Sequence, residues 1–258
     1  MSEEVKMRIG IGCRGDAEKV IASVARFSEK NGGTVVCYAD KSTCSGAKAS
    51  GCEFLLSEHP AEEMIDDLFC GKIDAAVRGS LPAGSTLAYL KKRYSVPYLR
   101  RIALLESPAG QKFFFAPVGV DEGWTIEDKE AFVYEGRRYA KACGLPEKTV
   151  VLAGGREGDV GRHPAVDKSI EDALEVCRRT GAVFGEILIE DAVSDAGVII
   201  APDGISGNLV FRTLALLGNG AGHGAPVVNI PDIYVDSSRA SESYDAILSF
   251  TARLVSMK

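Results

Sequence analysis

The stretch of sequence that decides the fold is VIIAPDGISGNLVFRTLALLGNGAGHGAPVVNIPDIYVDSSRASESYD, residues Val198–Asp245. It begins with an apolar run, Val198–Ala201, which leads through a glycine turn into a helix-like segment at Leu209–Leu217. Such a turn brings together unbonded backbone N–H groups and the positive end of the helix dipole. The pattern therefore predicts an anion site in the turn, the alternative being an ordinary N-cap turn. The candidate contacts are Ser206, Gly207 and Asn208.

A second turn of the same kind carries hydroxyl groups and an arginine. The apolar run Pro226–Ile230 precedes a helix pattern at Glu242–Met257, and Ser238 and Arg239 lie between them. The arginine offers a planar fork of donors that matches phosphate oxygens, and Ser238 could donate to the same anion. The alternatives are a surface ion pair of Arg239 with an acidic neighbour, and a capping role for Ser238 at the final helix. We expect the two strand-end turns to face one crevice and to bind phosphate or an acyl phosphate.

Composition describes a globular chain. Its 258 residues are enough for one large domain or two lobes, and 46% hydrophobic with 26% charged residues is ordinary globular usage. A net charge of −6 without a basic stripe argues against nucleic acid as a partner. No apolar run approaches membrane-spanning length, and the N-terminal segment MSEEVKMRIG has no apolar signal region. We therefore expect a cytoplasmic protein that acts on a small molecule.

Short strand-like runs alternate with helix-like segments along the chain. The predicted strands are 7–12, 34–38, 53–56, 75–78, 102–106, 112–116 and 149–153, with 186–189 left open. The predicted helices are 17–30, 61–70, 85–94, 124–143 and 167–180. This alternation predicts an α/β fold with mainly parallel, doubly wound sheets. The break in periodicity at Ser107–Gly110 predicts a hinge.

Cysteines and histidines indicate neither a metal site nor a catalytic triad. Seven cysteines contain no CxxC pair, and Cys37, Cys44 and Cys52 are spaced too widely for a zinc knuckle. His163 and His223 lie in glycine-rich loops without a serine or cysteine arrangement beside them. We therefore expect no metal, and cysteines suited to a reducing compartment.

One motif resembles a dinucleotide-binding fingerprint. Gly10–Gly15 reads GIGCRG, a literal GxGxxG after a predicted strand, and Asp40 ends the next predicted strand. Asp16 and Glu18, however, occupy the opening of the following helix, where two carboxylates would repel a pyrophosphate. We therefore interpret the motif as a tight turn between strand and helix.

Two further loops carry candidate anion contacts. Arg78 and Ser80 end another predicted strand. Arg156 and Arg162 lie in the glycine-rich loop AGGREGDVGRHP, which could be a lid or a second anion contact. A plain surface loop is the alternative.

These motifs together resemble a known superfamily. The PDGxxGN turn and the later SRA tripeptide are similar to those of the phosphotransacylase superfamily, which includes the phosphate acetyl- and butyryltransferases. Arg78–Ser80 resembles the KGxxxT loop of the butyryl enzymes, with arginine in place of lysine. With Ala75–Ser80 and Ala153–Arg162 included, nearly the whole chain resembles the methanogenesis marker protein 4 family, the family of the methyltransferase subunit MtxX.

The resemblance implies an architecture and an assembly. It implies two α/β lobes of the phosphotransacylase and isocitrate/isopropylmalate dehydrogenase type, with the active cleft between them. The first lobe would comprise residues 1–108 and 236–258, and the second residues 109–235. Superfamily members form dimers, so we expect a homodimer with closed twofold symmetry. The apolar residues that could contribute to its interface are Phe211, Leu214 and Leu217, the alternative being that they are core residues.

The resemblance also implies a chemistry. Coenzyme A would be a co-substrate, Asp245 would deprotonate its thiol, and Ser238 would belong to the same catalytic group. The alternative for Asp245 is a first-turn acid that the helix dipole favours. The butyryl enzymes have an acid soon after the SRA tripeptide, where this chain has Ser241.

Three functions follow, in order of preference. The first is a transferase that binds a phosphorylated or acyl-phosphate substrate. The second is a methyltransferase-associated subunit of methanogenic metabolism, with another subunit as partner, although the sequence contains no separate methyl-donor motif. The third is a non-catalytic protein that keeps the anion site.

Overall fold

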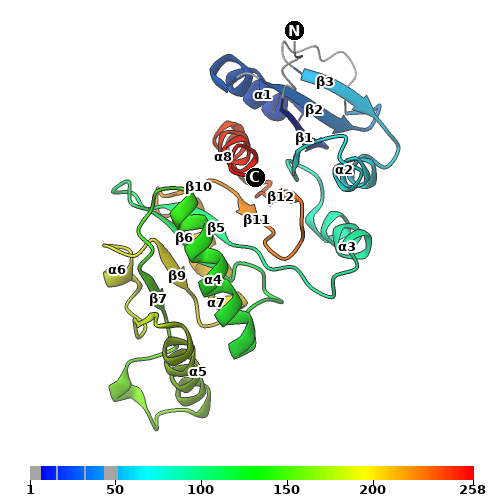
Figure 1. Ribbon diagram of the computed structural model, residues 1–258. Helices are drawn as coiled ribbons and strands as arrows, with labels where there is room; N and C mark the ends of the chain where they lie inside the picture. The colour runs from blue at the N-terminus through cyan, green and yellow to red at the C-terminus, as the bar shows by residue number, and fades with distance from the viewer. Residues whose placement is uncertain (1–6, 16, 32, 44–51) are drawn as a thin grey trace. The chain divides into compact units, whose positions relative to one another are not determined.

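The computed structural model describes residues 7–15, 17–31, 33–43 and 52–258. The chain divides into two compact units, one of Met1–Leu99 with His223–Lys258 and one of Arg100–Gly222. Each unit contains a six-stranded sheet with helices packed on it (Figure 1). Residues 100–108 thus belong to the second unit and residues 223–235 to the first.

The sheet of the first unit is parallel except at one edge. Its order is β11-β12-β4-β1-β2-β3, and only the pairing of β11 with β12 is antiparallel. The strands are β1 (Arg8–Cys13), β2 (Thr34–Ala39), β3 (Cys52–Leu56), β4 (Ala75–Val77), β11 (Ala225–Pro226) and β12 (Ile233–Asp236). The helices are α1 (Ala17–Asn31), α2 (Pro60–Phe69), α3 (Ala83–Tyr94) and α8 (Asp245–Val255). Central strands covered on both faces read as continuous apolar runs, and β1 and β2 are buried over most of their length for this reason.

The sheet of the second unit has the order β10-β5-β6-β9-β7-β8. The strands are β5 (Ala103–Glu106), β6 (Lys112–Ala116), β7 (Thr149–Val151), β8 (Val183–Phe184), β9 (Val198–Ile200) and β10 (Ala221–Gly222). The helices are α4 (Ile126–Ala142), η1 (Glu157–Asp159), α5 (Pro164–Thr180), α6 (Ile189–Ala192) and α7 (Gly204–Leu216). Strands β6, β9, β7 and β8 are parallel, whereas at one edge β5 pairs antiparallel with β6 and β10 pairs antiparallel with β5. Phe113, Phe114 and Phe115 on β6 are fully buried, and the Phe114 ring meets Tyr139 of α4 edge-on at 5.8 Å. The predicted doubly wound α/β class is confirmed.

Two local predictions are wrong, and one open question is decided. The expected hinge at Ser107–Gly110 is the turn of a hairpin, because β5 and β6 pair antiparallel and Ser107 N donates to Gln111 O at 2.8 Å. The run Pro226–Ile230 contributes only its first residue to a strand, and the strand that leads to Ser238 is β12. Residues 186–189 form no strand, since β8 lies before them and α6 begins at Ile189.

Candidate functional site

The strand order of the first unit marks where a ligand is expected. From β1 the chain passes to β2 and β3 on one side, and then returns to place β4 on the other side of β1. Open parallel sheets bind ligands at such a switch point, outside the carboxyl ends of the strands. The relevant loops are therefore those that follow β1, β4 and β12.

The loops after β1 and β4 are bonded to each other. Ser80 N donates to Gly12 O at 3.1 Å, and Ser80 Oγ accepts from Arg14 N at 2.8 Å. Gly79 adopts a left-handed φ of 61°, and a Cβ there would overlap with the Gly12 carbonyl oxygen. Only glycine suits both conditions, so the close approach of the two loops depends on it.

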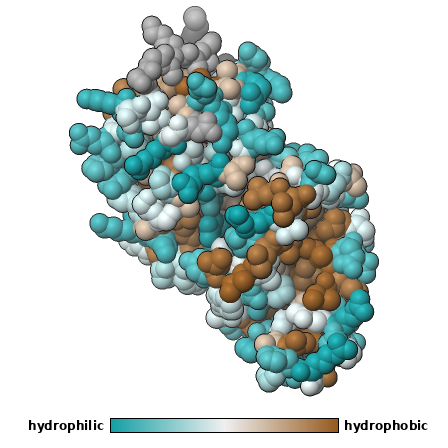
Figure 2. All heavy atoms as spheres, turned by 180° about the vertical axis from the view of Figure 1, so that it is seen from behind, coloured by the Kyte–Doolittle hydropathy of each residue, from teal (hydrophilic) through white to brown (hydrophobic). Residues whose placement is uncertain are grey.

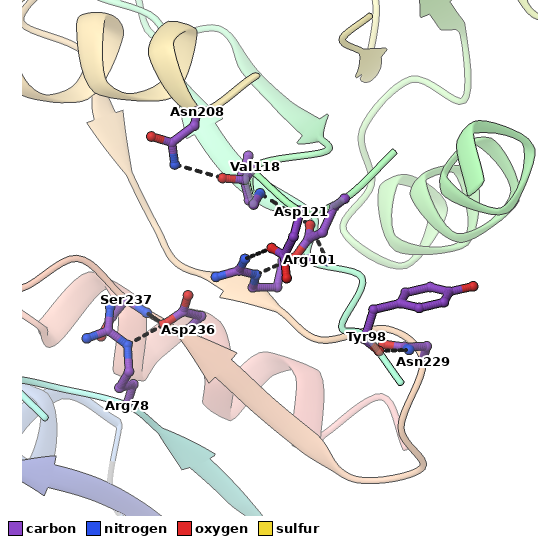
Figure 3. A network of polar contacts seen from close by, with 11 residues as sticks. Arg78, Tyr98, Arg101, Val118, Asp121, Asn208, Asn229, Asp236 and Ser237 are labelled. Carbon is purple, nitrogen blue, oxygen red and sulfur yellow. Dashed lines mark hydrogen bonds and ion pairs between the residues drawn. The ribbon is translucent and has the colours of Figure 1, made fainter. Parts of the chain in front are cut away.

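A buried ion pair joins the loop after β4 to the end of β12 (Figure 3). Arg78 Nε donates to Asp236 Oδ1, and Arg78 Nη1 donates to Leu81 O at 2.7 Å. The two side chains are only 6% and 12% exposed. Ser237 adds a contact from its Oγ to Gly79 O at 3.1 Å. Arg78 therefore has a carboxylate partner of its own, and its clearest role in this structure is to hold the two loops together.

Ser238 and Arg239 follow this junction. Ser238 Oγ accepts from Ala240 N at 3.1 Å. The N-cap of α8 is Tyr244, without a side-chain cap, so the capping alternative for Ser238 is wrong. Arg239 is exposed and, within the described parts of the chain, its guanidinium has no ion pair with Asp236 or Glu242. Its donor fork is therefore available to a ligand.

Two further cations lie beside these candidates, and no motif in the sequence selects them. Lys19 Nζ donates to Arg239 O at 3.1 Å, which places α1 next to the loop after β12. Arg14 is exposed and touches Ser80 through its backbone. Asp40, at the end of β2, balances part of this charge. Hydrogen bonds from Ser42 and Thr43, with a smaller effect of Arg14, lower the pKa of Asp40 to about 2.

Asp245 is the first residue of α8 and pairs with α1. Its Oδ1 accepts from Arg26 Nη2 at 3.1 Å. Burial alone would raise the pKa of Asp245, but hydrogen bonds from Ser243 and Arg26 outweigh it, so the pKa lies below its ordinary value. A lowered pKa makes a weaker base. The geometry thus agrees with the helix-dipole alternative, and a role as base requires Asp245 to leave Arg26 first.

The dinucleotide-like motif is explained by packing. A Cβ on Gly10 would lie 2.6 Å from Ile73 Cδ1, and a Cβ on Gly12 would overlap with the Leu81 side chain. These two glycines therefore let neighbouring side chains cross β1. Glu18 lies in the first turn of α1, as expected, whereas Asp16 lies outside the described residues.

The glycine turn of the second unit is already filled by the chain itself. Helix α7 begins at Gly204, earlier than predicted, because Asp203 caps it. Asp203 Oδ1 accepts from Ile205 N at 2.9 Å and Ser206 N at 2.8 Å, and Gly207 N donates to Asp203 O at 3.0 Å. The prediction of unbonded N–H groups in this turn is wrong, since these donors have partners and a carboxylate lies at the helix start.

Gly207 and Asn208 hold α7 against the loop after β6. A Cβ on Gly207 would overlap with the Pro117 carbonyl oxygen, and Asn208 Nδ2 donates to Val118 O at 2.8 Å (Figure 3). The close approach that Gly207 permits is therefore to the chain's own backbone. The Asn208 amide is used in the same way.

A buried pair stiffens that loop. Arg101 Nε donates to Glu122 Oε1 at 2.6 Å, and the two side chains are 13% and 1% exposed. Burial raises the pKa of Glu122, against the lowering effect of Arg101. Arg101 Nη2 also lies 3.7 Å from Asp121 Oδ1, and the two side chains are drawn side by side in Figure 3. Because charged residues are seldom buried, nothing in the sequence marked this pair.

The loop with Arg156 and Arg162 is a pinned surface loop. Arg156 is exposed, and Arg162 pairs with Asp159 at 2.9 Å while 75% of its side chain stays exposed. Gly154 N donates to Ser169 Oγ at 2.8 Å and Gly161 N to Asp167 Oδ1 at 2.7 Å. The loop amides are thus bonded to α5, which agrees with the surface-loop alternative.

The described residues contain neither a metal-binding cluster nor a membrane-spanning helix. They contain no group of three or more His, Cys, Asp or Glu side chains that could hold a metal ion. No helix among them combines the length and the apolar character needed to cross a bilayer. Cys44, one of the cysteines considered for a zinc knuckle, lies outside this part of the chain.

Comparisons with known proteins agree with this architecture. No family model matches the chain. The chain is 38% identical over 254 residues to "Putative methyltransferase mtx subunit X" of Methanosarcina mazei. The aligned region covers 96% of this chain and 90% of that protein. The structure of a branched-chain phosphotransacylase from Enterococcus faecalis matches with a TM-score of 0.75 at 18% identity, covering 96% of this chain and 99% of that one. EutD phosphotransacetylase from Staphylococcus aureus matches with a TM-score of 0.67 at 15% identity, covering 98% and 94%.

Proposed function

Because the chain belongs to the mtx subunit X family and has a phosphotransacylase-like fold, we propose that it is a transferase that binds phosphate or an acyl phosphate. The site would lie at the carboxyl ends of β1, β4 and β12. The observation that carries the proposal is the bonded junction of Gly12, Arg14 and Ser80 at the switch point, with Arg239 beside it. We expect the protein to act in the cytoplasm.

The donors suit a dianion. Arg239 supplies the fork, Arg14 and Lys19 add positive charge, and Ser238 supplies a hydroxyl group. Arg78 is bonded to Asp236 and to Leu81 O, so its contribution would be to hold the loop that carries Ser80 against the end of β12. Arg156 and Arg162 lie on a loop of the second unit and serve as comparison residues in the tests below.

The direct test is phosphate binding by titration calorimetry. Arg239→Ala is expected to weaken binding by about 10- to 150-fold, the equivalent of a hydrogen bond to a charged group worth roughly 1.5–3 kcal/mol. Arg156→Ala removes the same charge from the surface loop and is expected to bind as the wild type does. Equal affinity of wild type and Arg239→Ala, or no binding at millimolar phosphate, contradicts the site.

A second test concerns the reaction. Coenzyme A would be the co-substrate, and phosphate would attack the thioester of an acyl-CoA to give an acyl phosphate and the coenzyme A thiol. Thiol release from acetyl-CoA or butyryl-CoA that requires phosphate supports a transferase. Phosphate binding without release from either thioester supports the non-catalytic alternative instead.

The name of the relatives favours a second candidate function. The protein from Methanosarcina mazei is named as a subunit of a methyltransferase, so this chain would serve a methyltransferase as an associated subunit. Co-purification of one further methyltransferase polypeptide with the tagged chain from a methanogen distinguishes this role from that of an independent transferase.

We further propose a homodimer formed through α7. The helix carries a single charged residue, Arg212, and exposes Ile205 and Leu209, while Leu217 directly after it is 82% exposed. Helix α7 belongs to the second unit. Figure 2 shows a broad apolar patch on this unit. A surface helix whose exposed residues are mostly apolar is unusual, and a second copy would cover it with the same apolar surface.

Of the three predicted interface residues, Leu217 is the exposed one. Phe211 and Leu214 are half-buried, because they pack beside Gly222 and Gly220 near β10. Leu217→Asp is therefore expected to convert a dimer into monomers in sedimentation velocity at micromolar concentration. A wild-type monomer under these conditions rules out a stable dimer.

A further inference from the structure

Two cysteines lie against each other in the sheet of the first unit. Cys37 is fully buried in β2, and Cys52 is the half-buried first residue of β3. The register pairs Cys52 with Val35, two residues before Cys37, so both thiols project from the same face of the sheet. Their Sγ atoms are 2.8 Å apart.

This spacing is close to that of a covalent bond. A disulfide has an S–S distance of about 2.05 Å, so the sulfur atoms need to approach each other by only about 0.8 Å. Strand β3 is at the edge of the sheet and pairs with β2 alone in the described part of the chain, so it can move toward β2 without breaking a second ladder. The diagonal register requires such a movement, because Cys37 and Cys52 are not directly opposite.

The two thiols differ in reactivity. Cys52 is the accessible one, and its hydrogen bond with Cys37 lowers the pKa of the Cys52 thiol despite the opposing effect of burial. A lowered pKa increases the thiolate, which is the form that attacks disulfides. Cys177 provides a contrast, because burial raises the pKa of its thiol to about 11.

We propose that Cys37 and Cys52 form a dithiol site that is oxidised to an intramolecular disulfide by low-molecular-weight disulfides. The Cys52 thiolate attacks one sulfur of oxidised glutathione and expels the first glutathione thiolate, which leaves a mixed disulfide on Cys52. The Cys37 thiol then passes its proton to the expelled glutathione thiolate and attacks the Cys52 sulfur, which expels the second glutathione as a thiolate that takes up the proton Cys52 first released. In total, the two protein thiols lose two electrons, and one molecule of glutathione disulfide gains them and is reduced to two molecules of glutathione.

The bond would link the edge strand β3 to its neighbour β2. In a reducing compartment the site stays as two thiols, and it responds when the disulfide fraction of the small-thiol pool rises. The inference is independent of the proposed transferase function.

The test uses the reduced full-length protein under native conditions. After incubation with oxidised glutathione, thiols are counted in denaturant, and alkylated peptides are mapped by mass spectrometry. The expected result is a fall from seven thiols by two, with a peptide that links Cys37 to Cys52. Seven remaining thiols, glutathione confined to the exposed Cys70, or a link from Cys52 to Cys44 overturns the proposal.

Two variants separate the steps. Cys37→Ser is expected to stop at the mixed disulfide, so one glutathione stays on Cys52. Cys70→Ser is the matched control and is expected to form the Cys37–Cys52 bond as the wild type does. Because Cys37 is in the core, its variant could fail to fold, and the peptide map of the wild-type chain alone then decides. A Cys37→Ser protein that folds and carries no glutathione on Cys52 contradicts the order of attack.

Discussion

Removal of the Asp236 carboxylate tests the central claim about the first unit. Asp236→Ala leaves the Arg78 guanidinium, in a side chain only 6% exposed, without its charged partner. The guanidinium keeps its bond to Leu81 O, and the backbone of Ser237 also loses an acceptor. Breaking a buried pair by removal of one partner costs about 3–5 kcal/mol, because the remaining charge stays buried and uncompensated.

The assay is urea unfolding followed by circular dichroism. The matched control is Asp195→Ala, which breaks the pair of Lys148 and Asp195, whose side chains are 41% and 57% exposed. An exposed pair contributes at most about 1 kcal/mol, so this control is expected to lose little. Replacing both partners, with Arg78→Met and Asp236→Leu together, is expected to cost less than Asp236→Ala alone, because no buried charge remains.

The result that refutes this reasoning is a small effect of Asp236→Ala. If its free energy of unfolding falls by no more than that of Asp195→Ala, the Arg78–Asp236 pair does not hold the loops after β4 and β12. A double variant that loses as much as Asp236→Ala would likewise show that lost packing, and not an uncompensated charge, is the cause.

The remaining predictions concern the two helix starts. Asp203→Ala removes the N-cap of α7 and is expected to lower the free energy of unfolding by about 1 kcal/mol. Asp203→Asn keeps a side-chain acceptor and is expected to lose less stability. If calorimetry shows equal losses for the two variants, the side chain of Asp203 does not act as a cap. Gly207→Ala is expected to destabilise the chain by more than about 1 kcal/mol, because the added Cβ would overlap with the Pro117 backbone. The control is Gly84→Ala in α3, which has open space around the added Cβ and is expected to be neutral or stabilising. A Gly207→Ala variant as stable as the wild type would show that α7 can shift. The pKa of Asp245 is lowered by folding, so its stabilising contribution is complete above its unfolded pKa of about 4 and is lost as the pH falls through the folded value. The stability difference between wild type and Asp245→Asn is therefore expected to shrink between pH 6 and pH 3 in urea unfolding, and a difference that is constant with pH contradicts the ion pair with Arg26. If Asp245 is also the base, Asp245→Asn lowers thiol-dependent turnover by roughly 10²–10⁴-fold and leaves phosphate affinity unchanged.

Local patterns predicted most of the elements. The helix over 17–30 and the strand over 112–116 agree with α1 and β6, because amphipathic period and buried apolar runs are local properties of the chain. The errors occurred where a single contact overrides the pattern. The start of α7 moved to Gly204 because the Asp203 carboxylate caps it, and the apolar residues from Val227 onward form a connection before β12.

The candidate site was predicted in part. The positions of Ser238 and Arg239 after a strand were expected, whereas the partners of Arg78 and Asp245 were not. Arg78 and Asp236 are 158 residues apart, and Arg26 and Asp245 are 219 apart. No local signal relates residues at such separations, and the same arginine or aspartate on a surface would leave an identical sequence pattern.

The sequence by itself determined the α/β class, the family resemblance and the strand-end location of the polar residues. These depend on residue period, turn chemistry and motif order, all of which are written along the chain. Only the tertiary structure decided that Arg78 is neutralised by Asp236, that Asp245 is paired with Arg26, and that Lys19 lies against the loop of Arg239. Each of these depends on which loops the sheet order places side by side, and that order results from packing of the whole unit.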